Sequence, residues 1–217
     1  MPVFSKGKVN ILFLHIPKSA GSTIEKIADD FGWEESFSIR GKSLKEIRYC
    51  KASLQHLHVQ PLESILEFEQ FDSIFTVVRN PFSRFKSEYY WQRTQGITEL
   101  SVDDWVSDTF EKYLGNSYIY DNHIRPQVEF IPRSPHQPQV FKLEEGGVER
   151  AKKLFLGFSN ESENRNSWAK WLTSLFTPDR QEKRSLKYPE IEAKFERHYD
   201  RIVEFYKQDY STLSYKI

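Results

Sequence analysis

The chain of 217 residues lacks the features that mark several classes of protein. A single cysteine, Cys50, excludes an internal disulfide framework and a zinc site made of cysteines alone. Neither charge sign is in excess, because 31 Lys and Arg residues balance 31 Asp and Glu residues. We therefore expect no general attraction to nucleic acid or to an anionic membrane surface, and any site for an anion must be local.

Long apolar runs are missing as well. The run from Val9 to Ile16 has the length of a strand, far below the roughly 20 residues that cross a bilayer. We read no signal peptide and no membrane anchor, and we expect a soluble, cytoplasmic protein. The length fits one compact domain, residues 1–217, with a sizeable buried core.

Two apolar segments predict strands that are covered on both faces, as in a parallel sheet: residues 9–16 and 73–78. A helix start follows each one. Ser22 and Glu25 have the spacing of a capping box, and Asn80 with Pro81 is typical of an N-cap and a first helical residue. Strand, loop and helix therefore occur twice, which predicts an α/β fold.

The rest of the chain adds helices around this core. Ser101 is expected to cap a helix with acidic residues in its first turn, and segments 139–145 and 147–158 are predicted to be a strand and a helix. The polar segment 159–188 is expected to be a mobile loop or helical insertion. A closing helix is predicted over 189–210, with four apolar or aromatic residues on one face: Phe195, Tyr199, Ile202 and Tyr206.

The loop after the first strand, with the sequence PKSAGST, suits an anion. A helix that begins at a loop presents free backbone N–H groups and the positive end of its dipole. Lys18 adds a charge, and the other residues are small or carry hydroxyl donors: Pro17, Ser19, Ala20, Gly21, Ser22 and Thr23. The pattern G-x-x-x-x-G-K-S/T of kinases and NTPases is absent. Taken alone, the loop is equally compatible with a plain helix cap and a solvated lysine.

The loop after the second strand supplies another set of donors. Arg79 stands at the carboxyl end of that strand, where ligands bind in open α/β sheets, and its guanidinium suits a phosphate. Ser87 lies about two turns along the next helix. The simpler interpretations are a solvent-facing Ser87 and a surface pair of Arg84 with Glu88. Two such loops suit a ligand with two separated anionic groups.

These segments resemble those of a known family. HIPKSAGST resembles the 5′-phosphosulfate-binding loop of sulfotransferases that use 3′-phosphoadenosine 5′-phosphosulfate (PAPS), and VVRNPFSRFKSEY resembles their 3′-phosphate-binding segment. The pair, in this order and about 60 residues apart, is more specific than either segment alone. The likeness to the carbohydrate, heparan sulfate 2-O-like branch continues through QHLHV, DNHIRPQVEFI and YKQDYSTLSY. It implies a P-loop-like three-layer fold with a central parallel sheet flanked by helices.

The resemblance also implies roles for the residues of both loops. Residues 17–23 would hold the phosphosulfate, with Lys18 offsetting the charge that grows on the leaving phosphate. Arg79 and Ser87 would hold the 3′-phosphate, and no metal ion is implied. Ser19, where many relatives carry threonine, keeps the hydroxyl. The segment SNESENRNSW matches the family poorly, so no cofactor contact is assigned there.

Transfer of a sulfuryl group to a hydroxyl requires a base, and histidine is the side chain whose ordinary pKa suits this role near neutral pH. His56 and His58 resemble the paired histidines of heparan sulfate 2-O-sulfotransferases, whose corresponding segment carries the base. Placed in a strand, the two would face one cleft. We predict that His58 or His56 is the base and that the other is structural, with Lys18 as a further catalytic residue.

His123 is the rival base. Its segment, DNHIRPQ, resembles a family segment near the acceptor, which makes His123 and Arg125 candidate acceptor contacts, with Gln127 as a further hydrogen-bonding group. His15 is expected to be packed or to orient the first loop. The two remaining histidines are expected at the surface: His136 and His198.

We therefore expect an enzyme that moves the sulfuryl group of PAPS by direct in-line transfer to a hydroxyl of a carbohydrate-type acceptor and releases 3′-phosphoadenosine 5′-phosphate (PAP). Two other interpretations stay open. The chain could be a PAP-, PAPS- or glycan-binding module without turnover, or an atypical nucleotide kinase, which would require Mg²⁺ and ATP. No nucleic-acid partner and no stable membrane insertion are expected.

Overall fold

The structure, a computed structural model, describes residues 1–39, 46, 49–133, 135–158 and 189–217. The segment expected to form a mobile insertion, 159–188, lies outside these residues. Within the described part of the chain, no helix is long and apolar enough to cross a membrane.

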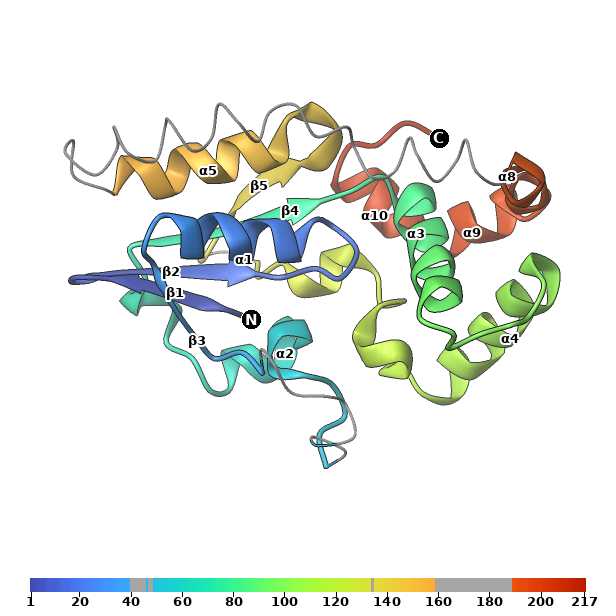
Figure 1. The fold of residues 1–217 in the computed structure, drawn as a ribbon, viewed down its shortest axis with the longest axis horizontal. Helices are drawn as coiled ribbons and strands as arrows, with labels where there is room; N and C mark the ends of the chain where they lie inside the picture. The colour runs from blue at the N-terminus through green and yellow to red at the C-terminus, as the bar shows by residue number, and fades with distance from the viewer. Residues whose placement is uncertain (40–45, 47–48, 134, 159–188) are drawn as a thin grey trace.

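A five-stranded sheet forms the centre of the molecule, in the order β3-β1-β2-β4-β5 (Figure 1). The two predicted strands are present as β2 (Val9–Leu14) and β4 (Ser73–Val78), and they pair in parallel. β5 (Gln139–Lys142) joins β4 in parallel. It is shorter than predicted, because Leu143–Glu145 turns into a 3₁₀ helix.

Two short strands extend the sheet beyond β2. β1 (Val3–Lys6) and β3 (Glu34–Ser36) both pair in the antiparallel sense. Their sequences, VFSK and EES, are too short to show a strand pattern by themselves. The predicted α/β fold is confirmed, and the sheet, expected to be parallel, is mostly parallel with antiparallel pairing at β1.

Helices cover both faces of this sheet. α1 (Gly21–Asp30) and α5 (Gly147–Gly157) lie side by side over one face (Figure 1), where they bury apolar side chains of β1, β2 and β4. The other face carries a second apolar cluster, with contributions from α2 (Val59–Glu63), from the 3₁₀ helix η4 (Gln127–Phe130) and from Leu213. The result is the three-layer arrangement that was expected.

Beyond the carboxyl end of β4, helices pack around Trp105 in a third apolar cluster. The N-caps of α3 (Pro81–Thr94) and α4 (Val102–Gly115) are the predicted Asn80 and Ser101, whose side chains accept backbone hydrogen bonds from the first turns. Local capping chemistry therefore sets where both helices begin.

The closing segment differs from its prediction. Instead of one helix over 189–210, it forms α8 (Pro189–Glu196), α9 (Tyr199–Phe205) and α10 (Lys207–Thr212). A straight helix of that length would extend roughly 33 Å, whereas α8, α9 and α10 contact α4, α3 and η4, respectively. The breaks bring most of the predicted apolar face onto that one cluster: Phe195, Ile202 and Tyr206 are buried and Tyr199 is partly buried.

Phe155 of α5 is fully buried against Phe4, Trp33 and Phe75. Phe155→Ala leaves a cavity there, so we expect it to lower the free energy of unfolding by about 3–5 kcal/mol in urea denaturation. Phe158, just after the same helix, is 39% exposed, and Phe158→Ala should change that free energy by less than about 0.5 kcal/mol. Equal effects of the two substitutions would show that α5 does not contribute to the core.

Candidate active site

The loop after β2 enters α1 through left-handed backbone conformations. Lys18 and Ala20 have positive φ angles of 66° and 68°, and Ala20 is the N-cap of α1 without a side-chain hydrogen bond. Such residues beside a helix start make a concave surface of backbone N–H groups that binds anions. The buried hydroxyl of Ser19 has no hydrogen-bond partner among the described residues. An anionic oxygen would satisfy it, so the loop fits a phosphate-type ligand.

The capping box predicted from Ser22 and Glu25 does not form, because α1 begins at Gly21 and Ala20 occupies the N-cap. Oε1 of Glu25 instead lies 3.1 Å from Nδ1 of His15. His15 packs so closely on the loop that a Cβ atom at position 21 would come within 1.7 Å of its Nε2. Gly21 is therefore required to seat His15 against the loop, and His15 is packed, as expected.

Two buried arginines connect the second predicted segment to the first. Arg79, at the end of β4, donates from Nη1 to the backbone oxygen of Lys18 (3.0 Å). Arg84 donates from Nε to the oxygen of Pro17 (2.9 Å) and from Nη2 to the oxygen of His123 (2.8 Å). The simpler interpretation of Arg84 as a surface partner of Glu88 does not hold, because its guanidinium donates to backbone oxygens of two buried segments. Arg84 is 1% exposed and connects the loop after β2 to the segment of His123.

Three histidines lie in a row beside the first loop. The ring centroids of His15 and His56 are 4.8 Å apart, and those of His56 and His123 are 4.9 Å apart. Nδ1 of each ring lies 3.1, 2.7 and 2.7 Å from a carboxylate oxygen: Glu25, Asp121 and Glu88, respectively. In the sequence, Asp121 stands two positions before His123, and Glu88 directly follows Ser87, but neither was predicted to be a histidine partner. Glu25 and Glu88 come from separate helices.

His56 and Asp121 form a buried pair. The pKa of His56 is lowered to about 3, chiefly by burial. The two neighbouring imidazoles also lower it, and the hydrogen bond to Asp121 raises it only in part. Burial alone would raise the pKa of Asp121, but hydrogen bonds from His56 and from N and Oγ of Ser53 lower it to about 2. Near neutral pH, Asp121 is ionised and His56 is neutral with its proton on Nδ1. Nε2 of His56 is then the nitrogen with a free lone pair.

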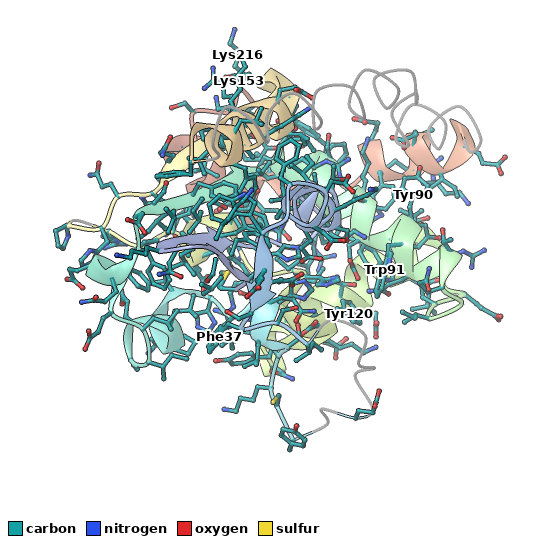
Figure 2. The ribbon with its side chains drawn as sticks, turned by 60° about the vertical axis from the view of Figure 1, so that its left-hand side comes forward. Phe37, Tyr90, Trp91, Tyr120, Lys153 and Lys216 are labelled. Atoms are coloured by element: carbon teal, nitrogen blue, oxygen red, sulfur yellow. The ribbon has the colours of Figure 1, made fainter. Side chains whose placement is uncertain are left out.

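The pair of Glu88 and His123 has a similar arrangement. Burial would raise the pKa of Glu88, but His123, the charge of Lys18 and the Gln92 amide lower it below its ordinary value. The Lys18 ammonium lies 4.9 Å from the ring centroid of Trp91, which is labelled in Figure 2. The ring of His123 lies 5.3 Å from the same tryptophan ring. The Lys18 ammonium and the imidazole of His123 therefore both lie beside the ring of Trp91.

His58 lies apart from this row. The segment predicted as a strand is a 3₁₀ turn, Leu54–His56, followed by His58 as N-cap of α2, so the prediction of a shared strand face is wrong. His58 packs on Tyr118 (ring centroids 5.5 Å apart), and its buried Nδ1 has no hydrogen-bond partner in the part of the chain that the structure describes. Burial and the charge of Arg125 lower the pKa of His58 to about 4. The two histidines are separated because His56 ends the 3₁₀ helix and His58 begins α2 as its N-cap.

Arg125 ties its own segment together. Its Nε donates to Oδ1 of Asn122 (3.0 Å), its Nη2 to Oγ of Ser117 (2.8 Å), and its Nη1 to Glu129. Each nitrogen of the guanidinium thus has a partner within the protein. Arg125 is therefore better suited to fixing the conformation of the segment DNHIRPQ than to donating hydrogen bonds to a bound substrate.

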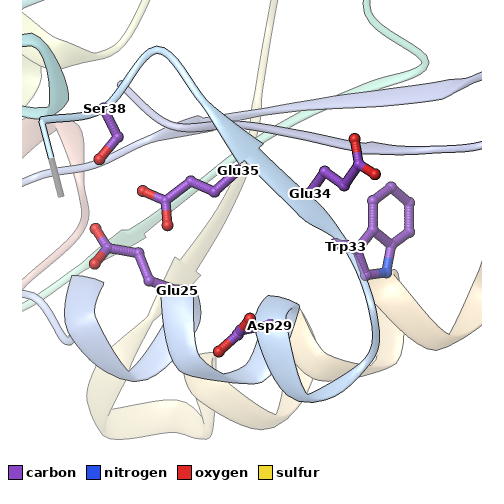
Figure 3. Close-up of a pocket in the computed structure, with 6 residues that line it drawn as sticks. All are labelled: Glu25, Asp29, Trp33, Glu34, Glu35 and Ser38. Carbon is purple, nitrogen blue, oxygen red and sulfur yellow. The ribbon is translucent and has the colours of Figure 1, made fainter.

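An acidic pocket of about 480 Å³ opens beside the row, at Glu25 (Figure 3). Carboxylates of α1 and β3 face each other across it, with one aromatic and one hydroxyl side chain: Glu25, Asp29, Glu34, Glu35, Trp33 and Ser38. Four carboxylates repel a polyanion. An anionic ligand is therefore directed to the loops and not to this pocket.

A protein-family model described as the sulfotransferase family matches residues 2–216 of the chain. The match spans both loops, the row of histidines and the closing helices. No curated protein and no solved structure gives a match.

The His56 imidazole accepts a proton near its ordinary pKa of 6.5 in the unfolded chain but only near pH 3 in the native protein. The native state therefore loses stability as the pH falls from 6.5 toward 3, by up to about 1.4 kcal/mol per pH unit for this group. His56→Asn keeps an N–H donor for Asp121 and removes the titration. Its unfolding free energy in urea should fall less steeply than that of the wild type between about pH 7 and pH 4.

The control for this experiment is Phe158→Ala, which replaces a partly exposed side chain without a titratable group and should keep the wild-type slope. Identical slopes for the wild type and His56→Asn would contradict the neutral, buried state of His56.

Proposed function

Since the chain belongs to the sulfotransferase family, we propose that it moves the sulfuryl group of PAPS to a hydroxyl of a carbohydrate-type acceptor by direct in-line transfer. The observation that carries the proposal is the contact between the two anion-binding loops, in which Arg79 donates to the backbone oxygen of Lys18 at 3.0 Å. Segments about 60 residues apart thus form one surface with two sets of donors. A ligand with two separated anionic groups, such as PAPS, matches that surface.

The first loop fits the phosphosulfate end of PAPS, which supplies an activated sulfuryl group. Residues 17–23 would bind it through backbone N–H groups at the start of α1 and through the unsatisfied hydroxyl of Ser19. Lys18, held near Trp91, would stabilise the negative charge that develops on the leaving phosphate.

The second segment fits the 3′-phosphate. The guanidinium of Arg79 can bind a phosphate through two parallel hydrogen bonds. Ser87, partly buried on α3, supplies a hydroxyl farther along the same helix. This contact would distinguish PAP from AMP, which lacks the 3′-phosphate.

We assign the base to His56 in preference to His58. Its Nε2 would accept the proton of the acceptor hydroxyl, and Asp121 would stabilise the imidazolium that forms. A pKa of about 3 makes His56 a weak base in the free protein, but negative charge bound at the neighbouring loop raises that pKa. His123, oriented by Glu88 in the same way, is the alternative base.

A carbohydrate acceptor is supported by the aromatic rings around these histidines. Trp91 lies beside His123, and Tyr118 lies beside His58. An aromatic ring offers an apolar face next to polar groups, which suits the mixed C–H and hydroxyl surface of a sugar.

The groups around His56 also allow a competing interpretation. Ligand-type atoms of His56, Asp121 and His123 lie within 4.8 Å of one another, and imidazole and carboxylate groups also bind divalent cations. We favour proton transfer, because Nδ1 of each imidazole is already hydrogen-bonded to a carboxylate. A chelator separates the two interpretations.

Calorimetric titration tests the nucleotide site. We expect PAP to bind more tightly than AMP or ATP, with no loss of affinity in EDTA, because the two loops hold its two phosphates without a metal. Lys18→Ala and Arg79→Ala should each weaken PAP binding by about tenfold or more, since each removes a charged donor. The control is Lys153→Ala, at an exposed lysine of α5 (Figure 2). If the folded protein fails to bind PAP, the proposed cofactor is wrong.

Turnover with labelled PAPS and a panel of carbohydrate acceptors tests the base. His56→Ala should reduce kcat by about 10²–10⁴-fold with PAP affinity nearly unchanged, because it removes proton transfer and not cofactor binding. His58→Ala should have a smaller effect, and His198→Ala none. Full turnover in a folded His56→Ala/His58→Ala double variant would exclude this pair and favour His123. PAP binding without transfer to any acceptor would support a binding module.

A further inference from the structure

The turn between β4 and α3 has its backbone held by side chains from distant segments. The Gln127 amide makes two hydrogen bonds with Arg79: Oε1 accepts from the backbone N–H (2.9 Å), and Nε2 donates to the backbone oxygen (2.8 Å). Oε1 of Glu144 accepts from the backbone N–H of Asn80 (2.7 Å). Three backbone groups of the turn are therefore held by two side chains.

These two side chains are in turn held by the last residues of the chain. Asp209, in α10, accepts from the backbone N–H and the Nε2 of Gln127 (2.9 and 3.3 Å) and from the N–H of Val128 (3.0 Å). The hydroxyl of Tyr215 donates to Oε2 of Glu144 (3.0 Å). Two short chains of hydrogen bonds thus connect the C-terminal segment to the turn between β4 and α3.

The Gln127 link allows only one orientation of the amide. Gln127 and Asp209 are both fully buried, and the three hydrogen bonds that Asp209 receives from η4 all come from N–H donors. Nε2 must therefore face Asp209, which leaves Oε1 facing the N–H of Arg79. A reversed amide would oppose two oxygens and leave backbone groups of Arg79 unsatisfied, which is unfavourable in a buried site.

We infer that Gln127 and Asp209 are positioning residues for Arg79, and that through it they set the preference for a nucleotide with a 3′-phosphate. The inference rests on the proposed function, in which Arg79 binds that phosphate. A bidentate contact between a guanidinium and a phosphate depends on the orientation of the guanidinium plane. The position of the Arg79 backbone determines that orientation. Gln127 was expected to be a hydrogen-bonding group near the acceptor, but its amide is engaged by Arg79 and Asp209 instead.

Binding of PAP and AMP tests this role by calorimetric titration, because the two nucleotides differ only in the 3′-phosphate. The ratio of the AMP and PAP dissociation constants isolates that contact. Gln127→Met keeps the volume without the hydrogen bonds, and Asp209→Asn keeps the shape with one acceptor fewer. In each variant we expect the ratio to fall by about tenfold with AMP affinity unchanged.

A matched control comes from the same segment. Tyr206→Phe removes an equally buried hydrogen bond, from the Tyr206 hydroxyl to the oxygen of Ile124 (2.7 Å), and should leave the ratio unchanged. In a double-mutant cycle, Asp209→Asn should add no further loss of PAP affinity to Arg79→Ala. Equal weakening of PAP and AMP, additive losses in the cycle, or an unchanged ratio would overturn the inference.

A wild-type protein that does not prefer PAP to AMP would contradict the proposed function instead. The positioning itself is then tested without nucleotide, by hydrogen exchange at the backbone amide of Arg79, whose N–H donates to Gln127. Gln127→Met and Asp209→Asn should speed this exchange relative to the wild type and to Tyr206→Phe. Equal exchange in all four proteins would overturn the positioning role.

Discussion

The site depends on two buried guanidinium groups that join the loop after β2 to the turn after β4. Arg79 and Arg84 each donate to a backbone oxygen of that loop, and Arg84 also reaches the oxygen of His123. Parallel strands end at one edge of a sheet, so β2 and β4 bring the two loops near each other. The arginines turn this proximity into a fixed geometry, because the guanidinium presents several donors in a rigid plane.

The site brings hydrogen-bond donors for an anion close to imidazoles that are oriented by carboxylates. Backbone N–H groups, Lys18 and Arg79 form the side that suits an anionic sulfuryl donor. The row of imidazoles lies beside the first loop, where hydrogen bonds lower the pKa values of Asp121 and Glu88, and in the proposed function Nε2 of His56 accepts the proton. In-line transfer requires that the leaving group and the attacking hydroxyl lie on opposite sides of the group that moves. The proposed transfer uses both sets of groups, with the donors of the loops at the leaving phosphate and His56 at the attacking hydroxyl.

Local patterns in the sequence predicted much of the framework. The strands β2 and β4, the N-caps Asn80 and Ser101 and the helix α5 depend on neighbouring residues only, and each is present. The predictions that failed involve partners from distant segments. Glu25 lies beside His15 and does not form a capping box. Arg84 donates to backbone oxygens of two buried segments. The predicted closing helix is three shorter helices that contribute to one apolar cluster.

The sequence by itself determined the family, the two loops proposed to bind anions and the set of candidate histidines, because these are properties of short segments read in order. Only the tertiary structure decided how the candidates differ. His56 lies next to Asp121 and between two other imidazoles. His58, two positions away, packs on Tyr118 and pairs with no carboxylate among the residues that the structure describes. The physical reason is that burial and hydrogen-bond partners set the pKa and tautomer of an imidazole, and both are contributed by residues far away in the chain.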